Sequence, residues 1–295
     1  MRNIVIAEGN SKISMQTLIF SSVVNIILNP IFVIVLHMGV KGSAIATVIA
    51  QSLGAIWLFI YFIRGKSTFS LQHFSFNIKQ HLTSEILYFG FPTFVLMAAG
   101  SSVSVAVNWM LNIHGGSLAI AAYGITNRIL GFAIMPINGF TQVMPPIVGY
   151  NYGAKNISRV RSTVKLSFII ATLMAIISWV IVELFASYFV RIFTSDTLLI
   201  QSSSNAIRII LLCAPTIGIQ IVCSGLYQSL GKIKISLLIS IMRQLVCLIP
   251  LLFILPSFWG VNGVWYAFPI ADLVAFLTNI IIFSKTSKSF LENMN

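Results

Sequence analysis

The sequence predicts an all-α integral membrane protein with eight transmembrane helices. Of its 295 residues, 57% are hydrophobic and only 8% are charged, and the mean hydropathy is +0.95. A soluble domain carries roughly a quarter charged residues because its surface must face water. Most of this chain's surface must therefore face lipid. The apolar runs reach the ~20 residues that a helix needs to cross a bilayer, and they lack the alternation of about ten residues that barrel strands show.

We expect the eight spans, in order, at residues 16–40, 42–63, 86–113, 118–150, 166–190, 204–230, 235–258 and 261–284. The basic residues give their orientation. With the N-terminus inside, the inner segments hold Arg2, Lys12, Arg64, Lys66, Lys79, Lys155, Arg159, Arg161, Lys165, Lys232, Lys234, Lys285 and Lys288, against Lys41 and Arg191 outside. This asymmetry follows the positive-inside rule. It also accounts for the net charge of +12, so we expect no nucleic-acid partner.

Chemistry-bearing motifs are sparse in this chain. Cys213, Cys223 and Cys247 lie within spans and have no metal-ligand spacing, which is typical of buried free thiols. The sequence has no GxSxG motif and no HExxH motif. We therefore expect no enzyme, no metal beyond a possible sodium ion, and no cofactor. The first fifteen residues include Glu8 and Lys12 and lack the apolar core of a signal peptide.

Two distant segments resemble each other. Residues 39–50 (GVKGSAIATVIA) align with residues 260–271 (GVNGVWYAFPIA), and Gly9 and Pro30 align with Gly231 and Pro250 at nearly the same offset. Six spans lie between the copies, so both copies enter the membrane in the same direction. The sequence therefore predicts a parallel repeat of six helices, the kind of duplication on which alternating access is often built.

The first expected span contains an unusual polar cluster. Asn25 and Asn29 are four residues apart and share one helix face. Pro30 has no N–H and cannot donate to the carbonyl of Ile26. Amide oxygens, this carbonyl and a hydroxyl from the next span are hard ligands, suited to a small cation or to proton-carrying water. The alternative is that the asparagines only form hydrogen bonds across a helix interface.

The repeat helps to decide whether the asparagines form an ion site or only pack two helices together. Leu245 and Ile249 lie opposite the two asparagines in the second copy, and Phe268 lies opposite Thr47. A packing device would be expected in both copies, whereas the polar cluster occurs in one.

Other polar residues within spans are costly in lipid and are often functional. Arg243 and Asp272 fall on the last two helices, where we expect them to pair, and a structural and a proton-linked role are both consistent with this pattern. Asn127 and Arg128 are candidates for lining a substrate cavity, although an arginine can also snorkel to the interface.

Several motifs together resemble those of a known transporter family. They are residues 8–15 (EGNSKISM), 25–32 (NIILNPIF), 145–156 (PPIVGYNYGAKN), 227–236 (YQSLGKIKIS) and 260–272 (GVNGVWYAFPIAD). In this order the chain resembles the multidrug and toxin extrusion (MATE) transporters, in the bacterial DinF/MepA-like branch. The resemblance implies a twelve-helix fold of two six-helix lobes, which exports drugs in exchange for sodium ions or protons.

On this resemblance the chain is similar to helices five to twelve, without the first four. It implies that residues 1–65 are the last two helices of an incomplete N-terminal lobe. Residues 66–84 are then a cytoplasmic linker, and residues 85–295 a complete six-helix C-terminal lobe. The family's N-lobe ion site uses an asparagine and an aspartate four apart and a threonine on the next helix, which correspond to Asn25, Asn29 and Thr47. The departure is Asn29, because an amide carries no negative charge and releases no proton.

The resemblance thus implies a sodium- or proton-coupled drug antiporter, multi-pass in the bacterial plasma membrane and monomeric. Its partners would be small cationic or amphipathic drugs and membrane lipid. Two alternatives stay open. One is a lipid-linked oligosaccharide flippase of related architecture, whose cavity should be more strongly cationic than Arg128 and Arg243 allow. The other is an inactive transporter fragment.

Overall fold

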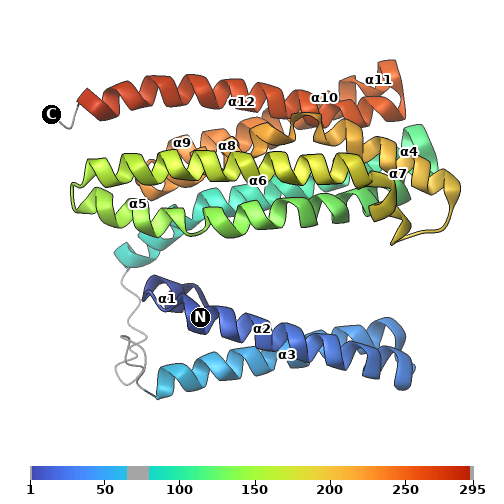
Figure 1. Ribbon diagram of the computed structural model, residues 1–295, viewed down its shortest axis with the longest axis horizontal. Coiled ribbons are helices and arrows are strands. Elements are labelled where there is room, and N and C mark those ends of the chain that lie inside the picture. The colour runs from blue at the N-terminus through green and yellow to red at the C-terminus, as the bar shows by residue number, and fades with distance from the viewer. Residues whose placement is uncertain (1, 65–79, 293–295) are drawn as a thin grey trace. The chain divides into compact units, whose positions relative to one another are not determined.

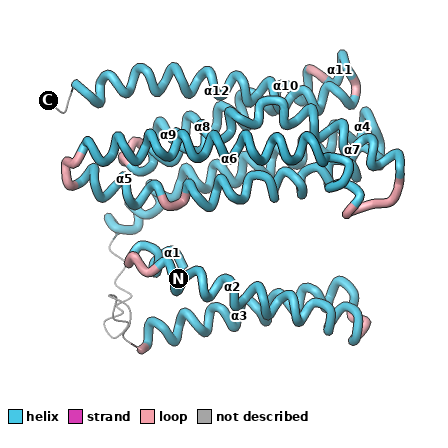
Figure 2. Tube along the Cα trace, viewed as in Figure 1, coloured by secondary structure: helices cyan, strands magenta, loops and turns pink. Residues whose placement is uncertain are grey.

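The computed structural model describes residues 2–64 and 80–292, which form helices joined by short turns (Figures 1 and 2). The expected all-α class is confirmed for these residues. The chain divides into two compact units, Met1–Lys79 and Gln80–Asn295. This boundary falls within the expected linker at residues 66–84, most of which lies outside the described residues.

The first unit is a helical hairpin with a short leading helix. Its elements are α1 (Arg2–Ala7), α2 (Ser11–Pro30), the π-helix η1 (Ile31–Val35) and α3 (Gly39–Ile63), and α2 packs along α3 (Figure 1). The first span was expected to reach residue 40, which is wrong, because the helix ends at Val35. The reason is the backbone at His37 and Gly39, whose φ angles of 51° and 53° turn the chain back.

Small residues allow α3 to approach α2 and η1 closely. Gly42, Ala46 and Ala50 are buried on the same side of α3. A Cβ atom on Gly42 would lie only 2.7 Å from the carbonyl oxygen of Phe32. Gly39, three residues before Gly42, is exposed and forms the turn before this row of small residues.

The second unit is a bundle of longer helices. Its elements are α4 (Gln80–Thr141), α5 (Met144–Gly153), α6 (Ile157–Arg191), α7 (Thr197–Ile210), the 3₁₀ turn η3 (Leu211–Cys213), α8 (Ala214–Ser229), α9 (Ile233–Ile241), the π-helix η4 (Met242–Leu248), α10 (Ile249–Ile254), α11 (Pro256–Trp259) and α12 (Val261–Glu292). Helix α6 packs against α4, α5, α7 and α8 (Figure 1).

Two long helices are interrupted next to prolines where continuous spans were expected. The span expected at 118–150 is interrupted after Thr141, and α5 begins just before Pro145. The span expected at 204–230 starts earlier, at Thr197, and is interrupted by η3 just before Pro215. The physical reason is that proline has no N–H and clashes with the preceding turn, so it is tolerated in the first turn of a new helix.

Seven helical segments of the described residues are long and apolar enough to cross a membrane. One of them, Phe94–Gly153, has 60 residues. Gly116 within it has a non-helical backbone, with φ 60° and ψ −158°. This conformation is open to glycine and strained for other residues.

The two segments of similar sequence also share backbone features. Gly260 turns the chain before α12 with a φ of 54°, as Gly39 does before α3. A Cβ atom on Gly263 would lie 2.4 Å from the carbonyl oxygen of Leu255, so the second copy has a close approach like that at Gly42. Ala267 and Ala271 continue this row of small residues and are 0% and 1% exposed.

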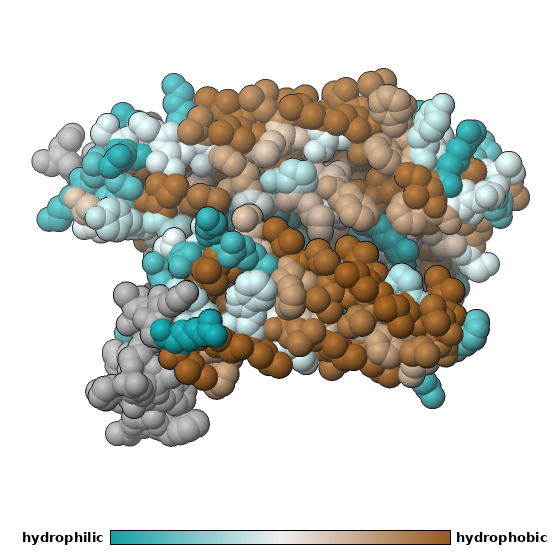
Figure 3. Space-filling model, turned by 60° about the horizontal axis from the view of Figure 1, so that its bottom comes forward, coloured by the Kyte–Doolittle hydropathy of each residue, from teal (hydrophilic) through white to brown (hydrophobic). Residues whose placement is uncertain are grey.

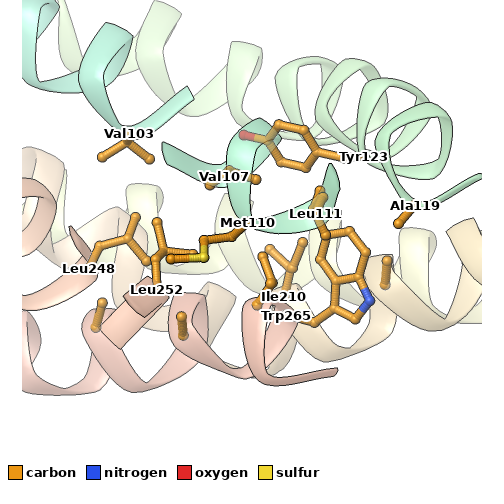
Figure 4. Close-up of a cluster of buried hydrophobic side chains, with 14 residues drawn as sticks. Val103, Val107, Met110, Leu111, Ala119, Tyr123, Ile210, Leu248, Leu252 and Trp265 are labelled. Atoms are coloured by element: carbon orange, nitrogen blue, oxygen red, sulfur yellow. The ribbon is translucent and has the colours of Figure 1, made fainter. Parts of the chain in front are cut away.

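The largest apolar core of the second unit joins α4 to α7, α10 and α12 (Figure 4). Trp265 is 2% exposed and stacks on Tyr123, with 6.3 Å between the ring centroids. Figure 4 shows Met110 of α4 next to Leu252 of α10. Phe268, the counterpart of Thr47 in the repeat, packs against this cluster.

The outer surface is apolar along the helices. Large hydrophobic side chains such as Ile26, Val105 and Leu184 are 69%, 71% and 69% exposed. Figure 3 shows hydrophobic side chains over the middle of the face in view and hydrophilic ones toward the helix ends. Such a surface is stable against lipid and unfavourable in water.

The close contact at Gly263 predicts a specific loss of stability. In Gly263→Ala the new Cβ meets backbone atoms, which cannot rotate away, so we expect a cost of about 1–3 kcal/mol. In the control Gly131→Ala the Cβ meets nothing within 4 Å, so helix propensity should leave stability equal or higher. Thermal unfolding in detergent measures both, and equal melting temperatures for the two variants would contradict the close contact.

Candidate functional site

The polar cluster of the first unit is held between α2 and α3. Nδ2 of Asn29 donates to Oδ1 of Asn25 at 2.9 Å and to its backbone carbonyl oxygen at 3.1 Å. Nδ2 of Asn25 donates to Oγ1 of Thr47 at 3.2 Å, and this hydroxyl donates to the carbonyl oxygen of Ser43 at 2.9 Å. The structure therefore brings the three expected residues together.

These hydrogen bonds form a relay that runs in one direction. Each group donates to the next, from Asn29 through Asn25 and Thr47 to a backbone carbonyl that ends the chain. None of the four residues carries a charge, and no described residue donates to Oδ1 of Asn29. The hydrogen bonds of the cluster thus form without an ion, and its oxygen atoms carry partial rather than full negative charges.

A groove of about 660 Å³ opens beside this cluster. Asn25 and Thr47 line it together with the polar side chains of Thr17, Ser21 and Gln51. Asn29 is not among the lining residues. Asn25 and Thr47, whose hydrogen bond joins α2 to α3, are therefore accessible from the groove.

The second unit contains a buried ion pair. Nε of Arg243, on η4, donates to Oδ1 of Asp272, on α12. The side chain of Asp272 is 2% exposed and that of Arg243 is 32% exposed. Nε2 of Gln220, on α8, donates to the backbone carbonyl of Asp272 at 3.1 Å and to Oγ1 of Thr216 at 3.3 Å. The pair therefore ties three segments of the bundle together.

Arg243 lies in a π-helical segment, η4. An extra residue per turn shifts the side-chain register locally, and such segments are frequent at functional sites.

A cavity of about 910 Å³ lies beside the ion pair. Residues of α4, α5, α8, α9 and η4 line it. Its polar lining consists of Ser101, Ser104, Asn138, Thr141, Gln142, Gln220, Ser224, Gln228, Ser240, Arg243 and Gln244. Asp272 is not a lining residue, so Arg243 separates this carboxylate from the cavity.

The other two expected cavity residues lie elsewhere. Asn127 and Arg128 are exposed on α4 and do not line the cavity beside Arg243. Sequence reasoning missed Gln220 and Gln244, which line the cavity. Gln220 donates to the backbone carbonyl of Asp272, and Gln244 directly follows Arg243 in the sequence. Gln220 could have been found because it is an amide between apolar residues, and Gln244 because it follows Arg243 within a span.

Comparisons with known proteins agree with this architecture. The sequence profile of the MatE family matches residues 92–254. The multidrug export protein MepA of Staphylococcus haemolyticus (strain JCSC1435) is 29% identical over 284 residues, which cover 94% of this chain and 61% of that protein. MepA of Staphylococcus aureus (strain MRSA252) is 26% identical, with 94% and 60% covered. The chain thus spans about three fifths of the length of these curated relatives.

Two solved structures show the same fold. A ligand-bound structure of the MATE multidrug transporter DinF-BH matches 96% of this chain and 64% of that one, with 43% identity and a TM-score of 0.86. A MATE structure in complex with MaL6 matches 97% of this chain and 66% of that one, with 23% identity and a TM-score of 0.87. This chain therefore belongs to the MatE family and is a multi-pass membrane protein of the bacterial plasma membrane.

Proposed function

We propose that this protein is a multidrug efflux transporter that exchanges sodium ions or protons for small cationic or amphipathic drugs, as a monomer in lipid. The observation that carries the proposal is the 43% identity to the transporter DinF-BH over 96% of this chain. The MepA relatives are named multidrug export proteins. The relatives are transporters rather than enzymes, and we propose no catalytic reaction.

The proposed arrangement has eight membrane crossings. A helix of 60 residues would be ~90 Å long, about three times the ~30 Å hydrocarbon core. The non-helical backbone at Gly116 supports a division of Phe94–Gly153 into two crossings, which would raise the number from seven to eight.

On this arrangement the chain corresponds to helices five to twelve of a two-lobe transporter. Residues 1–65 would be the last two helices of the N-terminal lobe, and residues 85–295 the six-helix C-terminal lobe. The matching turns at Gly39 and Gly260 and the matching close approaches at Gly42 and Gly263 support this repeat.

The two polar sites would have different roles in transport. The cluster of Asn25, Asn29 and Thr47 offers oxygen ligands to a coupling ion, but its neutrality makes binding weak compared with a site that includes a carboxylate. The Arg243–Asp272 pair is charged and lies beside a cavity large enough for a drug-sized molecule. In the proposed transporter, the first site is the place for the ion and the second lies beside the drug.

The relay geometry predicts what a carboxylate would do in the first site. In Asn29→Asp, a carboxylate oxygen would face Oδ1 of Asn25 at the present 2.9 Å. Two acceptors at this distance repel unless a proton or a cation lies between them. We therefore expect the melting temperature of the variant to rise by a few degrees when sodium is added or the pH falls, which corresponds to a gain of about 1–2 kcal/mol in stability. The melting temperature of the wild type should not change in this way.

The measurement is thermal unfolding of the purified chain in sodium chloride and in choline chloride at equal ionic strength, and across pH 5 to 8. The double variant Asn29→Asp/Thr47→Ala should respond less, because one oxygen ligand is lost. If the melting temperature of Asn29→Asp changes with neither sodium nor pH, the cluster serves only to pack α2 against α3.

The ion pair predicts strong coupling between its partners. Asp272→Asn leaves the guanidinium without a counter-charge, and we expect the free energy of unfolding to fall by about 3 kcal/mol. This value is at the lower end of the range for buried ion pairs, because Arg243 lines a cavity and is partly exposed. The double variant Arg243→Gln/Asp272→Asn removes both charges and should recover most of this loss. Thermal unfolding of the single and double variants measures the coupling, and strictly additive losses would argue against an energetic pair.

Transport is tested in proteoliposomes that contain the purified chain. For the proposed transporter we expect ethidium to move against its gradient when a sodium or proton gradient is imposed, and an ionophore should abolish the movement. Ethidium binding without movement under either gradient would favour an inactive fragment. Movement of a lipid-linked oligosaccharide without ethidium movement would favour the flippase.

A further inference from the structure

The cavity of the second unit has an uneven distribution of charge. Twenty described residues line it, and among them Arg243 is the one charged side chain, with no Asp or Glu. Ten further lining residues are neutral and polar, and the remainder are apolar or glycine. A solute in this cavity therefore meets a positive group and neutral dipoles, with no described acidic lining.

The carboxylate of Asp272 pairs with Arg243 and does not itself line the cavity. The pair is joined through Nε of Arg243, and its carboxylate is buried. Among the described residues, no acceptor takes a hydrogen bond from Nη1 or Nη2 of Arg243. A guanidinium has five N–H donors in a planar fork, so its outer edge keeps unused donors. The pair acts as a dipole whose positive end is the part that lines the cavity.

Two amides, Gln220 and Gln244, line the cavity together with this guanidinium. Nε2 of Gln220 is engaged by Thr216 and by the carbonyl of Asp272, which fixes its orientation. Oε1 of Gln244 is buried and has no hydrogen-bond partner among the described residues. An unmet buried acceptor is unfavourable, and its cost falls when a ligand or water supplies a donor. The apolar part of the lining includes Ile217 and Ile221.

We propose that this cavity selects amphipathic solutes that carry a carboxylate, which binds the outer edge of the Arg243 guanidinium while the apolar body packs on Ile217 and Ile221. The inference rests on the proposed transport function and, among its amphipathic substrates, gives the tighter binding to those that carry a carboxylate. A planar guanidinium matches a carboxylate through two parallel hydrogen bonds. A cation that lacks a carboxylate gains no such bond and places its charge near Arg243.

A matched pair of dyes isolates the carboxylate. An ethyl-ester rhodamine and the corresponding free acid, rhodamine 19, share one xanthene cation and differ only in whether the carboxyl group is esterified. Their binding is measured by fluorescence anisotropy with the purified chain in nanodiscs of phosphatidylcholine. We expect rhodamine 19 to bind about tenfold more tightly than its ethyl ester, because one charge-assisted hydrogen bond increases affinity by about this factor.

Variants assign the preference to Arg243. In Arg243→Gln/Asp272→Asn no unpaired charge remains, so the protein should fold, and the two dyes should bind equally within about twofold. Arg243→Lys keeps the charge without the fork and should show an intermediate preference. The matched control is Arg208→Gln/Glu183→Gln, which removes an ion pair outside this cavity and should keep the full preference.

Three results would overturn the inference. Tighter or equal binding of the ethyl ester by the wild type would do so, as would a preference that persists in Arg243→Gln/Asp272→Asn. Failure of both dyes to bind would do so as well. None of these decides whether the protein transports drugs, because ethidium movement in proteoliposomes tests that separately.

Discussion

Lipid cannot form hydrogen bonds with a polypeptide backbone, and this constraint governs how the chain can be interrupted. Every unpaired N–H or C=O in the hydrocarbon region costs several kcal/mol, so the backbone must stay helical or be buried. The breaks in the second unit follow this rule. Helix α8 restarts after η3 just before Pro215, and η4 joins α9 to α10 without leaving helical geometry. At these two places the irregularity is confined to a 3₁₀ and a π segment, in which most backbone groups stay paired.

The same constraint explains why small residues matter more here than apolar bulk. In lipid, helices gain little from covering apolar surface, because the lipid tails cover it as well. Close contact and polar bonds must therefore hold the helices together. Gly42 and Gly263 bring backbones into contact, and the Asn25–Thr47 bond and the Arg243–Asp272 pair join neighbouring helices.

The sequence predicted the elements well and their interruptions poorly. Long apolar runs give the position of a span because lipid thickness sets its length. They do not give its breaks: the chain turns at His37 because of a left-handed backbone that no hydropathy pattern signals. The asparagine cluster was predictable because a four-residue spacing fixes a shared face. Gln220 was missed because its partner, the carbonyl of Asp272, lies 52 residues away.

Asn127 and Arg128 show a related limit. Their depth in a span could be inferred from the sequence, whereas the face of α4 on which they lie could not. The structure puts them on an exposed side of that helix, away from the cavity.

The two units use one backbone pattern for different chemistry. The turn and the close approach recur at Gly39 and Gly42 and at Gly260 and Gly263, but the polar cluster of the first copy has no counterpart in the second. Where Thr47 completes a hydrogen-bonded relay, Phe268 packs into an apolar core beside Tyr123. The charged site of the second unit lies instead at Arg243 and Asp272. A scaffold that depends on glycine and alanine for packing leaves its other positions free to differ. The oxygens proposed to bind an ion and the guanidinium proposed to bind a solute can thus occupy separate units, with neither disturbing the helix contacts of the other.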